Sequence, residues 1–121
     1  LQLSIPLWSS GKRAAGITEK KLARQAAENS LADARDGLMV QHKQLRYNLS
    51  TAYEDFDTQK LNIDVSQRVY ESTSNKFEYG HASSLELTNA SMTLLTAQSD
   101  YVQAILNLVN AQIELKKLLN K

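Results

Sequence analysis

The chain has 121 residues, no Cys, one Pro and four Gly, with 14 Lys and Arg against 13 Asp and Glu. This length suggests a single domain, and the lack of Cys excludes disulfides, thiolate metal sites and Cys nucleophiles. A net charge of +1 argues against a nucleic-acid partner, whose binding surfaces are usually strongly basic. Because the apolar residues are mainly Leu and Ala, the composition favours an all-α fold of long helices packed side by side.

The first eleven residues differ from the rest. Apolar side chains alternate with other residues at Leu1, Leu3, Ile5 and Leu7, which is a strand period, and Pro6 restricts such a strand to a sheet edge or a strand end. We expect residues 1–11 to form a short extended segment and connector. No apolar run in the chain approaches the roughly 18 residues of a membrane helix. No signal peptide is recognised, and the start at Leu1 rather than Met suggests a piece of a larger protein.

A long helix is expected over residues 12–79, because this stretch contains no Pro and has a helix-favouring composition. Gly80 then suits a left-handed helix C-cap. Ser83 and Glu86 have the S-x-x-E spacing of a capping box, so a second helix is expected over residues 84–121. The connection over residues 80–83 is short, which predicts a long antiparallel helical hairpin of the coiled-coil or α-barrel-wall type, in one structural domain.

The second helix has a heptad seam on which small and large residues alternate. Two sets of residues, three positions apart, each recur every seven residues, and together they form one packing stripe. Alanine on one side of this seam lets a neighbouring backbone come close. We call the stripe the packing seam; it consists of Leu87, Ala90, Leu94, Ala97, Tyr101, Ala104, Leu108, Ala111, Leu115 and Leu118.

A second apolar stripe with the same seven-residue phase follows the same helix. In a supercoil frame of roughly 103° per residue, its midline lies ~150° from that of the packing seam. A helix with two seams is held between two partners, and seams at this angle would let identical helices close a ring of about a dozen members. We call this stripe the second seam; it consists of Met92, Leu95, Val102, Leu106, Val109 and Ile113.

The long helix repeats the pattern less regularly. One set of residues spaced by seven overlaps another, so the apolar stripe moves sideways along the helix, as expected if its neighbours change partway. The two sets are Leu31, Leu38, Leu45 and Ala52, and Leu49, Phe56, Ile63, Tyr70 and Phe77.

No catalytic, metal-binding or cofactor-binding constellation is recognised. His42 and His81 are far apart in sequence and have no carboxylate pattern around them, and no Gly-rich phosphate loop or G-x-S-x-G motif is present. The acidic pairs fit a mixed-charge, solvated helix surface. We therefore expect a protein that is not an enzyme.

The region around the predicted turn resembles the TolC-type outer-membrane efflux channels. Phe77 stands three residues before Gly80, Ser83 follows, and Glu86 is flanked by Leu85 and Leu87. The likeness continues in the Leu-Leu-Thr-Ala-Gln run of residues 94–98, in Tyr101 and in the alanines that recur every seven residues. Residues 3–13 look like the family's last barrel strand leading into its long helix. The resemblance covers essentially the whole chain, as the second, C-terminal repeat. Two positions depart from it: Asn89 stands where an acidic residue is common, and Ala82 where a basic residue can occur.

The resemblance implies a homotrimer with a β-barrel in the outer membrane and an α-helical tunnel across the periplasm of a Gram-negative bacterium. Such a channel is a passive exit duct that works with a periplasmic adaptor and an inner-membrane transporter. The resemblance also implies a partner-binding tip at Gly80, Ala82, Ser83, Ser84 and Leu85, and a pore entrance at Glu86 and Asn89. Two roles remain possible for Glu86: it caps the second helix, or it is one member of a ring of charges at the pore entrance. A periplasmic-adaptor hairpin and a coiled-coil scaffold remain alternatives, although an adaptor hairpin needs only one seam.

Overall fold

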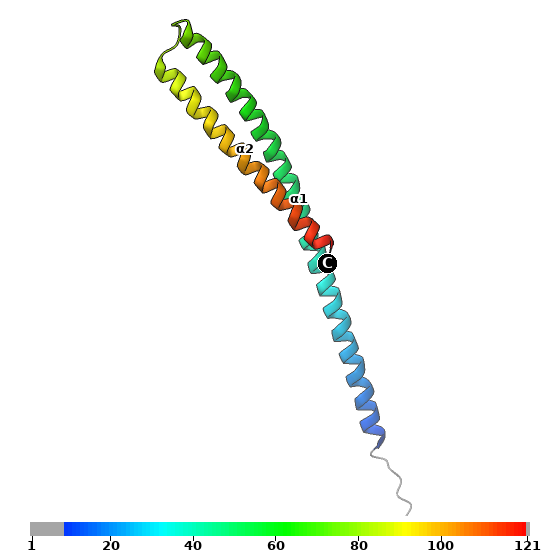
Figure 1. Ribbon diagram of the computed structural model, residues 1–121. Helices are drawn as coiled ribbons and strands as arrows, with labels where there is room; N and C mark the ends of the chain where they lie inside the picture. Colours follow the sequence, from blue (N-terminus) through cyan, green and yellow to red (C-terminus); the bar gives the residue numbers. More distant parts are fainter. Residues whose placement is uncertain (1–8, 121) are drawn as a thin grey trace, which may run out of the picture. The chain divides into compact units, whose positions relative to one another are not determined.

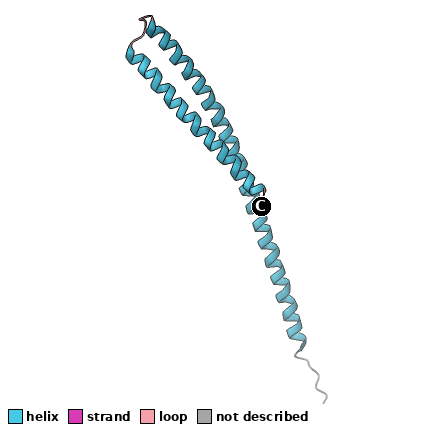
Figure 2. Ribbon diagram, viewed as in Figure 1, coloured by secondary structure: helices cyan, strands magenta, loops and turns pink. Residues whose placement is uncertain are grey.

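The computed structural model describes residues 9–120 and contains two α-helices, α1 (Ser9–Glu78) and α2 (Ser84–Leu119) (Figure 1). The chain divides into two units, residues Leu1–Gln41 and His42–Lys121. The first unit contains the first part of α1. The second contains the rest of α1, the turn and α2, and these form the expected antiparallel hairpin. No strand occurs among residues 9–120 (Figure 2). The all-α hairpin prediction is thus confirmed, whereas the extended segment at residues 1–8 lies outside the described residues.

Helix α1 begins earlier than the sequence indicated. Ser9, Ser10 and Gly11, which were expected in a connector, form the start of the helix. No Pro interrupts the chain after Pro6. Pairs of side chains four residues apart on the exposed surface of α1 stabilise the helix. Arg24 pairs with Glu28 at 2.8 Å and Arg68 with Asp64 at 2.9 Å.

The end of α1 has the hydrogen bonds of a Schellman motif. The N–H of His81 donates to the carbonyl of Lys76 at 2.7 Å, and the N–H of Gly80 donates to that of Phe77 at 3.0 Å. Gly80 has a φ of 75°, in the left-handed region that an L-residue enters only at a cost. The C-cap expected at Gly80 is therefore present, and it reverses the chain direction.

The hairpin has a thin core on the packing seam. Ala90, Ala97 and Ala104 are 9%, 8% and 1% exposed and are the buried hydrophobic residues of the described chain. The α1 stripe supplies half-buried side chains at Leu49, Phe56, Ile63 and Tyr70. Because alanine places no bulk between the helices, the α1 side chains fill the space above it. Leu31 and Leu38, at the start of the α1 stripe, are exposed within the first unit.

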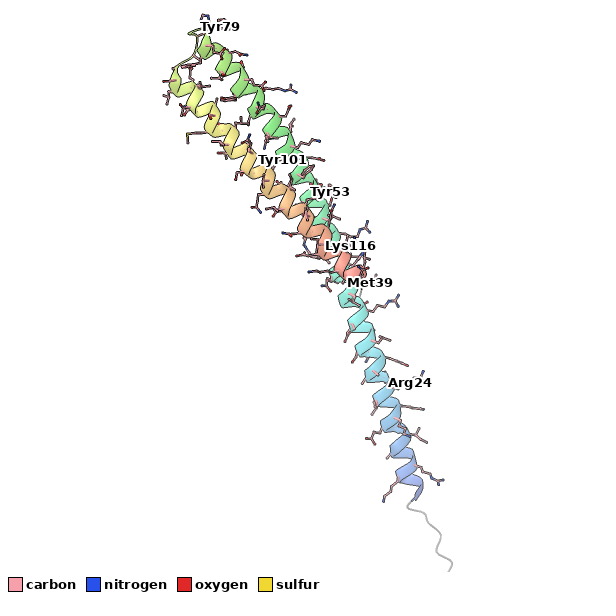
Figure 3. All side chains as sticks on the ribbon, viewed as in Figure 1. Arg24, Met39, Tyr53, Tyr79, Tyr101 and Lys116 are labelled. Carbon is pink, nitrogen blue, oxygen red and sulfur yellow. The ribbon has the colours of Figure 1, made fainter. Side chains whose placement is uncertain are left out.

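Two specific contacts join the helices, one at the middle of α2 and one closer to its C-terminal end. The rings of Phe56 and Tyr101 lie 5.5 Å apart at a tilt of 33°, within the range of favourable aromatic pairs. The side-chain amide of Gln112 donates to the hydroxyl oxygen of Tyr53 at 2.9 Å. Both tyrosines are marked in Figure 3. These contacts tie together residues more than forty positions apart and fix how the two helices are aligned.

Candidate functional site: the hairpin tip and the seams of α2

The hairpin tip presents small and apolar side chains at its surface. The expected tip residues Gly80, Ala82, Ser83, Ser84 and Leu85 lie in the turn and the first residues of α2. Leu85 is 68% exposed, and the space around the Cα of Gly80 is open. Apart from the half-buried Ala82, the tip residues are exposed to solvent. A protruding, weakly charged surface of this kind is accessible to a protein partner.

Glu86 closes the capping box predicted for the start of α2. The backbone N–H of Ser83 donates to Glu86 Oε2 at 2.7 Å, and the N–H of Glu86 donates to Ser83 Oγ at 3.2 Å. The Ser83 hydroxyl also donates to Glu86 Oε2 at 3.1 Å. These hydrogen bonds from Ser83, first the backbone and then the side chain, hold the pKa of Glu86 below its usual value. Glu86 thus caps the helix, and its charge also suits the positive end of the helix dipole.

Asn89, the second expected entrance residue, lies one turn further along α2. Its side chain is exposed, and its backbone carbonyl accepts a hydrogen bond from the Thr93 hydroxyl at 2.9 Å. No hydrogen bond of the Asn89 side chain is found among residues 9–120. Glu86 and Asn89 therefore occupy neighbouring turns without contacting each other through a hydrogen bond.

The packing seam lies against α1 over its whole length. Its three alanines Ala90, Ala97 and Ala104 are buried, and its other members are half-buried: Leu87, Leu94, Tyr101, Leu108, Ala111, Leu115 and Leu118. The contact is wider than the heptads indicated, because Ser91 and Ile105 are half-buried as well. The Tyr53–Gln112 hydrogen bond also lies outside the heptad pattern, so the heptads do not predict it.

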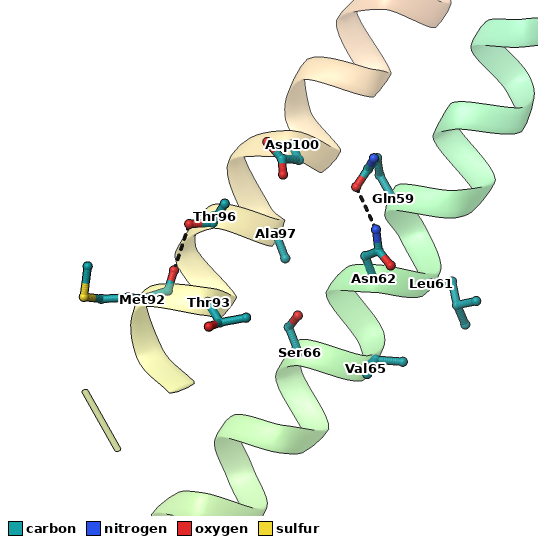
Figure 4. A pocket seen from close by; sticks show the side chains of 10 residues that line it. All are labelled: Gln59, Leu61, Asn62, Val65, Ser66, Met92, Thr93, Thr96, Ala97 and Asp100. Atoms are coloured by element: carbon teal, nitrogen blue, oxygen red, sulfur yellow. Dashed lines mark hydrogen bonds between the residues drawn. The ribbon is translucent and has the colours of Figure 1, made fainter. Parts of the chain in front are cut away.

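A polar groove runs along one side of the hairpin. It widens into two open hollows of about 500 Å³ and about 510 Å³. The first hollow is shown in Figure 4, where Ala97 points towards α1 while Met92 points away from it. Both hollows have a mixed lining. The polar members are amide, hydroxyl and carboxylate side chains, with Asp55, Asp100 and Glu114 as the acids and no basic side chain. The apolar members are Leu61, Val65, Met92 and Ala97 in the first hollow, and Ala52 and Ala111 beside Tyr47 in the second. This side of the hairpin suits contact with water.

The second seam is largely uncovered in the described part of the hairpin. Its six side chains are between 44% and 62% exposed, although they are large and apolar. They are Met92, Leu95, Val102, Leu106, Val109 and Ile113. Ser99 interrupts the stripe between Leu95 and Val102. A large apolar surface left uncovered on a helix usually marks an interaction surface. Within residues 9–120, one of the two predicted seams of α2 is therefore largely exposed.

The chain matches the family described as outer membrane efflux protein over residues 1–121. It belongs to that family. No curated protein and no solved structure was found to match it. Members of this family are components of outer-membrane efflux channels, so the chain is a channel component rather than a member of an enzyme family. Within residues 9–120, no helix is long and apolar enough to cross a bilayer, and no cluster of potential metal ligands occurs.

Proposed function

We propose that this chain forms part of the periplasmic tunnel wall of a homotrimeric outer-membrane efflux channel in a Gram-negative bacterium. The observation that carries the proposal is the second seam, which is apolar, exposed and placed across α2 from the packing seam. In a tunnel wall every helix has a neighbour on each side. The second seam would supply the contact with the next helix of the wall, and the polar groove would supply a surface in contact with water.

The exposed area of the second seam favours assembly. Each large apolar side chain that is covered contributes roughly 25 cal/mol per Å² of surface removed from water. Six such side chains over three heptads provide a stripe of the kind found in coiled-coil contacts. An adaptor hairpin, which was one alternative, needs only the packing seam. The exposed second seam and the family together favour the channel over the adaptor and over a coiled-coil scaffold.

The hairpin tip is the proposed docking end for the periplasmic adaptor, which in turn couples the channel to an inner-membrane transporter. The tip combines small residues with the exposed Leu85, so an adaptor helix or loop is able to approach its backbone closely. In this proposal the channel is a passive duct and holds no cofactor. Glu86 and Asn89 would stand at the pore entrance, where a homotrimer repeats each of them three times.

A bulky charge at the tip tests the docking role. In the full-length protein, we expect Ser84→Arg to reduce cross-linking to the adaptor and drug export, because the arginine obstructs the surface without entering the packing seam. Ser30→Arg, on the exposed surface of α1, is the matched control and should leave both measurements at wild-type values. If export and cross-linking survive Ser84→Arg and similar bulky changes along the tip, docking does not occur there.

A further inference from the structure

The polar groove continues the heptad positions of the two proposed entrance residues. Counting in sevens from Glu86 and from Asn89 gives two rows of exposed polar residues along α2, and residues seven apart share nearly the same face of a helix. Both rows contribute to both hollows, and Thr93, Thr96 and Asp100 are seen at the first hollow in Figure 4. We call them the polar rows; they are Glu86, Thr93, Asp100, Asn107 and Glu114, and Asn89, Thr96, Gln103, Asn110 and Lys117.

Helix α1 adds a similar row to the same side of the hairpin. Asn48, Asp55 and Asn62 are also spaced by seven, and each of them lines one of the two hollows. Within residues 9–120, no hydrogen bond or ion pair joins this row to the polar rows of α2. The amides bond along their own helix instead: Gln59 donates to Asp55 at 3.4 Å, and Gln103 donates to Asn107 at 3.0 Å. The groove is therefore not bridged and stays open to water.

The opposite side of the hairpin has a different character. On α1, Asp57 and Asp64 follow Asp55 and Asn62 by two residues, which places them roughly 200° further around the helix. This side carries both signs of charge, because Asp64 pairs with Arg68 at 2.9 Å.

The opposite side is also bridged between the helices. On α2 the heptad position between the seams holds Gln98 and Gln112 there, and the amide of Gln112 reaches the Tyr53 hydroxyl at 2.9 Å. The same heptad position is half-buried at Ser91 and Ile105. The two sides of the hairpin thus differ in charge, in burial and in the contacts that cross between the helices.

We propose that the groove side of the hairpin faces the pore of the assembled channel. The inference rests on the proposed function, in which Glu86 and Asn89 stand at the pore entrance, because the helix face that carries them continues along the polar rows. Amide and hydroxyl side chains hold water and bind passing solutes only weakly, as conduction requires. No basic side chain lines either hollow, and a water-filled cleft lined by one sign of charge concentrates counter-ions. The bridged side then forms the outer surface of the wall.

The test compares two cysteine variants of the full-length protein that differ in the side of α2 they occupy. Asn107→Cys lies in the groove, and Gln98→Cys is the matched control on the bridged side; both positions are exposed in the hairpin. Each protein is treated with a polyethylene glycol maleimide, and mass spectrometry measures the labelled fraction. Single-channel currents are then recorded in planar bilayers. Labelled Asn107→Cys should lose conductance stepwise, one step for each copy that reacts, because the polymer occupies the pore. Labelled Gln98→Cys and treated wild type should conduct as before.

The outcomes separate this inference from the proposed function. Fully labelled Asn107→Cys channels that keep their conductance would overturn the inference and leave the channel function intact. A loss in labelled Gln98→Cys that equals or exceeds the loss in labelled Asn107→Cys would overturn it as well, since the bridged side would then reach the pore. A wild-type protein that conducts no ions would contradict the channel function itself, and the inference would fall with it. Circular dichroism checks that each variant has the helix content of the wild type.

Discussion

Ala97 shows how a single small side chain sets the distance between two helices. It is 8% exposed on the packing seam and points towards α1 (Figure 4). Ala97→Leu adds three carbon atoms to a side chain that points at α1, so the helices must separate or the new side chain must take a strained rotamer. We expect a loss of about 1–3 kcal/mol in the free energy of unfolding. Ala27→Leu, at an exposed site of α1, should change it by less than about 0.5 kcal/mol. Equal unfolding midpoints for the two variants would mean that Ala97 is not tightly packed.

Glu86 makes the stability of the tip depend on pH. Its pKa is lowered in the folded chain by hydrogen bonds from Ser83, so ionisation stabilises the fold above the unfolded pKa of about 4.3. This contribution is lost as the pH falls through the lower folded pKa. We therefore expect Glu86→Gln, which keeps an acceptor but removes the charge, to lower the thermal midpoint slightly at neutral pH. The difference from wild type should disappear in acid.

Two further measurements on Glu86 separate its possible roles. Glu86→Ala, which also removes the acceptor, should lower the midpoint more than Glu86→Gln does. A difference between wild type and Glu86→Gln that stays constant with pH would contradict the cap. In the proposed trimer, unchanged cation selectivity and unchanged block by multivalent cations in Glu86→Gln would exclude a ring of entrance charges.

Local motifs predict the contacts of some residues from the sequence but not the contacts of others. The capping box of Ser83 and Glu86 follows from a four-residue pattern, and the buried alanines follow from their heptad spacing. The hydrogen bond between Tyr53 and Gln112 joins positions 59 residues apart. Its formation depends on how α1 and α2 are aligned and rotated, which no local pattern contains.

At the scale of the elements, Gly80 and Gly37 should respond in opposite directions to the same substitution. Both have open space around the Cα, so an added methyl group meets no neighbour at either site. Gly80 has a φ of 75°, and an L-residue in the left-handed region costs about 1–2 kcal/mol. Gly37 lies inside α1, where alanine is favoured over glycine by about 0.5–1 kcal/mol. Gly80→Ala should thus lower the thermal midpoint and Gly37→Ala should raise it. A midpoint raised by Gly80→Ala would contradict the left-handed cap.

The helices were predictable as elements because their ends carry recognisable signals. Gly80 marks the end of α1, and Ser83 with Glu86 marks the beginning of α2. The beginning of α1 was predicted three residues late, because Ser9, Ser10 and Gly11 interrupt the alternating apolar pattern of residues 1–7 and were assigned to a connector. Serine and glycine favour both connectors and first helical turns, so composition does not distinguish these cases. The width of the contact between α1 and α2 was also underestimated, because Ser91 and Ile105 lie outside the strict heptad.

For the whole molecule, we propose that the second seam of α2 becomes buried when full-length copies assemble. The sequence predicted this seam from its period, and the structure shows that the hairpin alone leaves it exposed. The hairpin formed by the described residues of the second unit does not cover it. The oligomeric state therefore has to be measured on the assembled protein.

The most direct test is the molar mass of the full-length protein in detergent, measured by light scattering, with a charge placed on the second seam. Val102 is half exposed in the hairpin, so Val102→Asp should leave the helix content unchanged. In the assembly the new carboxylate would be buried without a partner, at a cost of several kcal/mol. We predict a trimer for the wild type and for the control Asn110→Asp, on the polar groove, and a monomer for Val102→Asp. A Val102→Asp protein that remains trimeric with wild-type stability would show that the second seam is not an assembly contact.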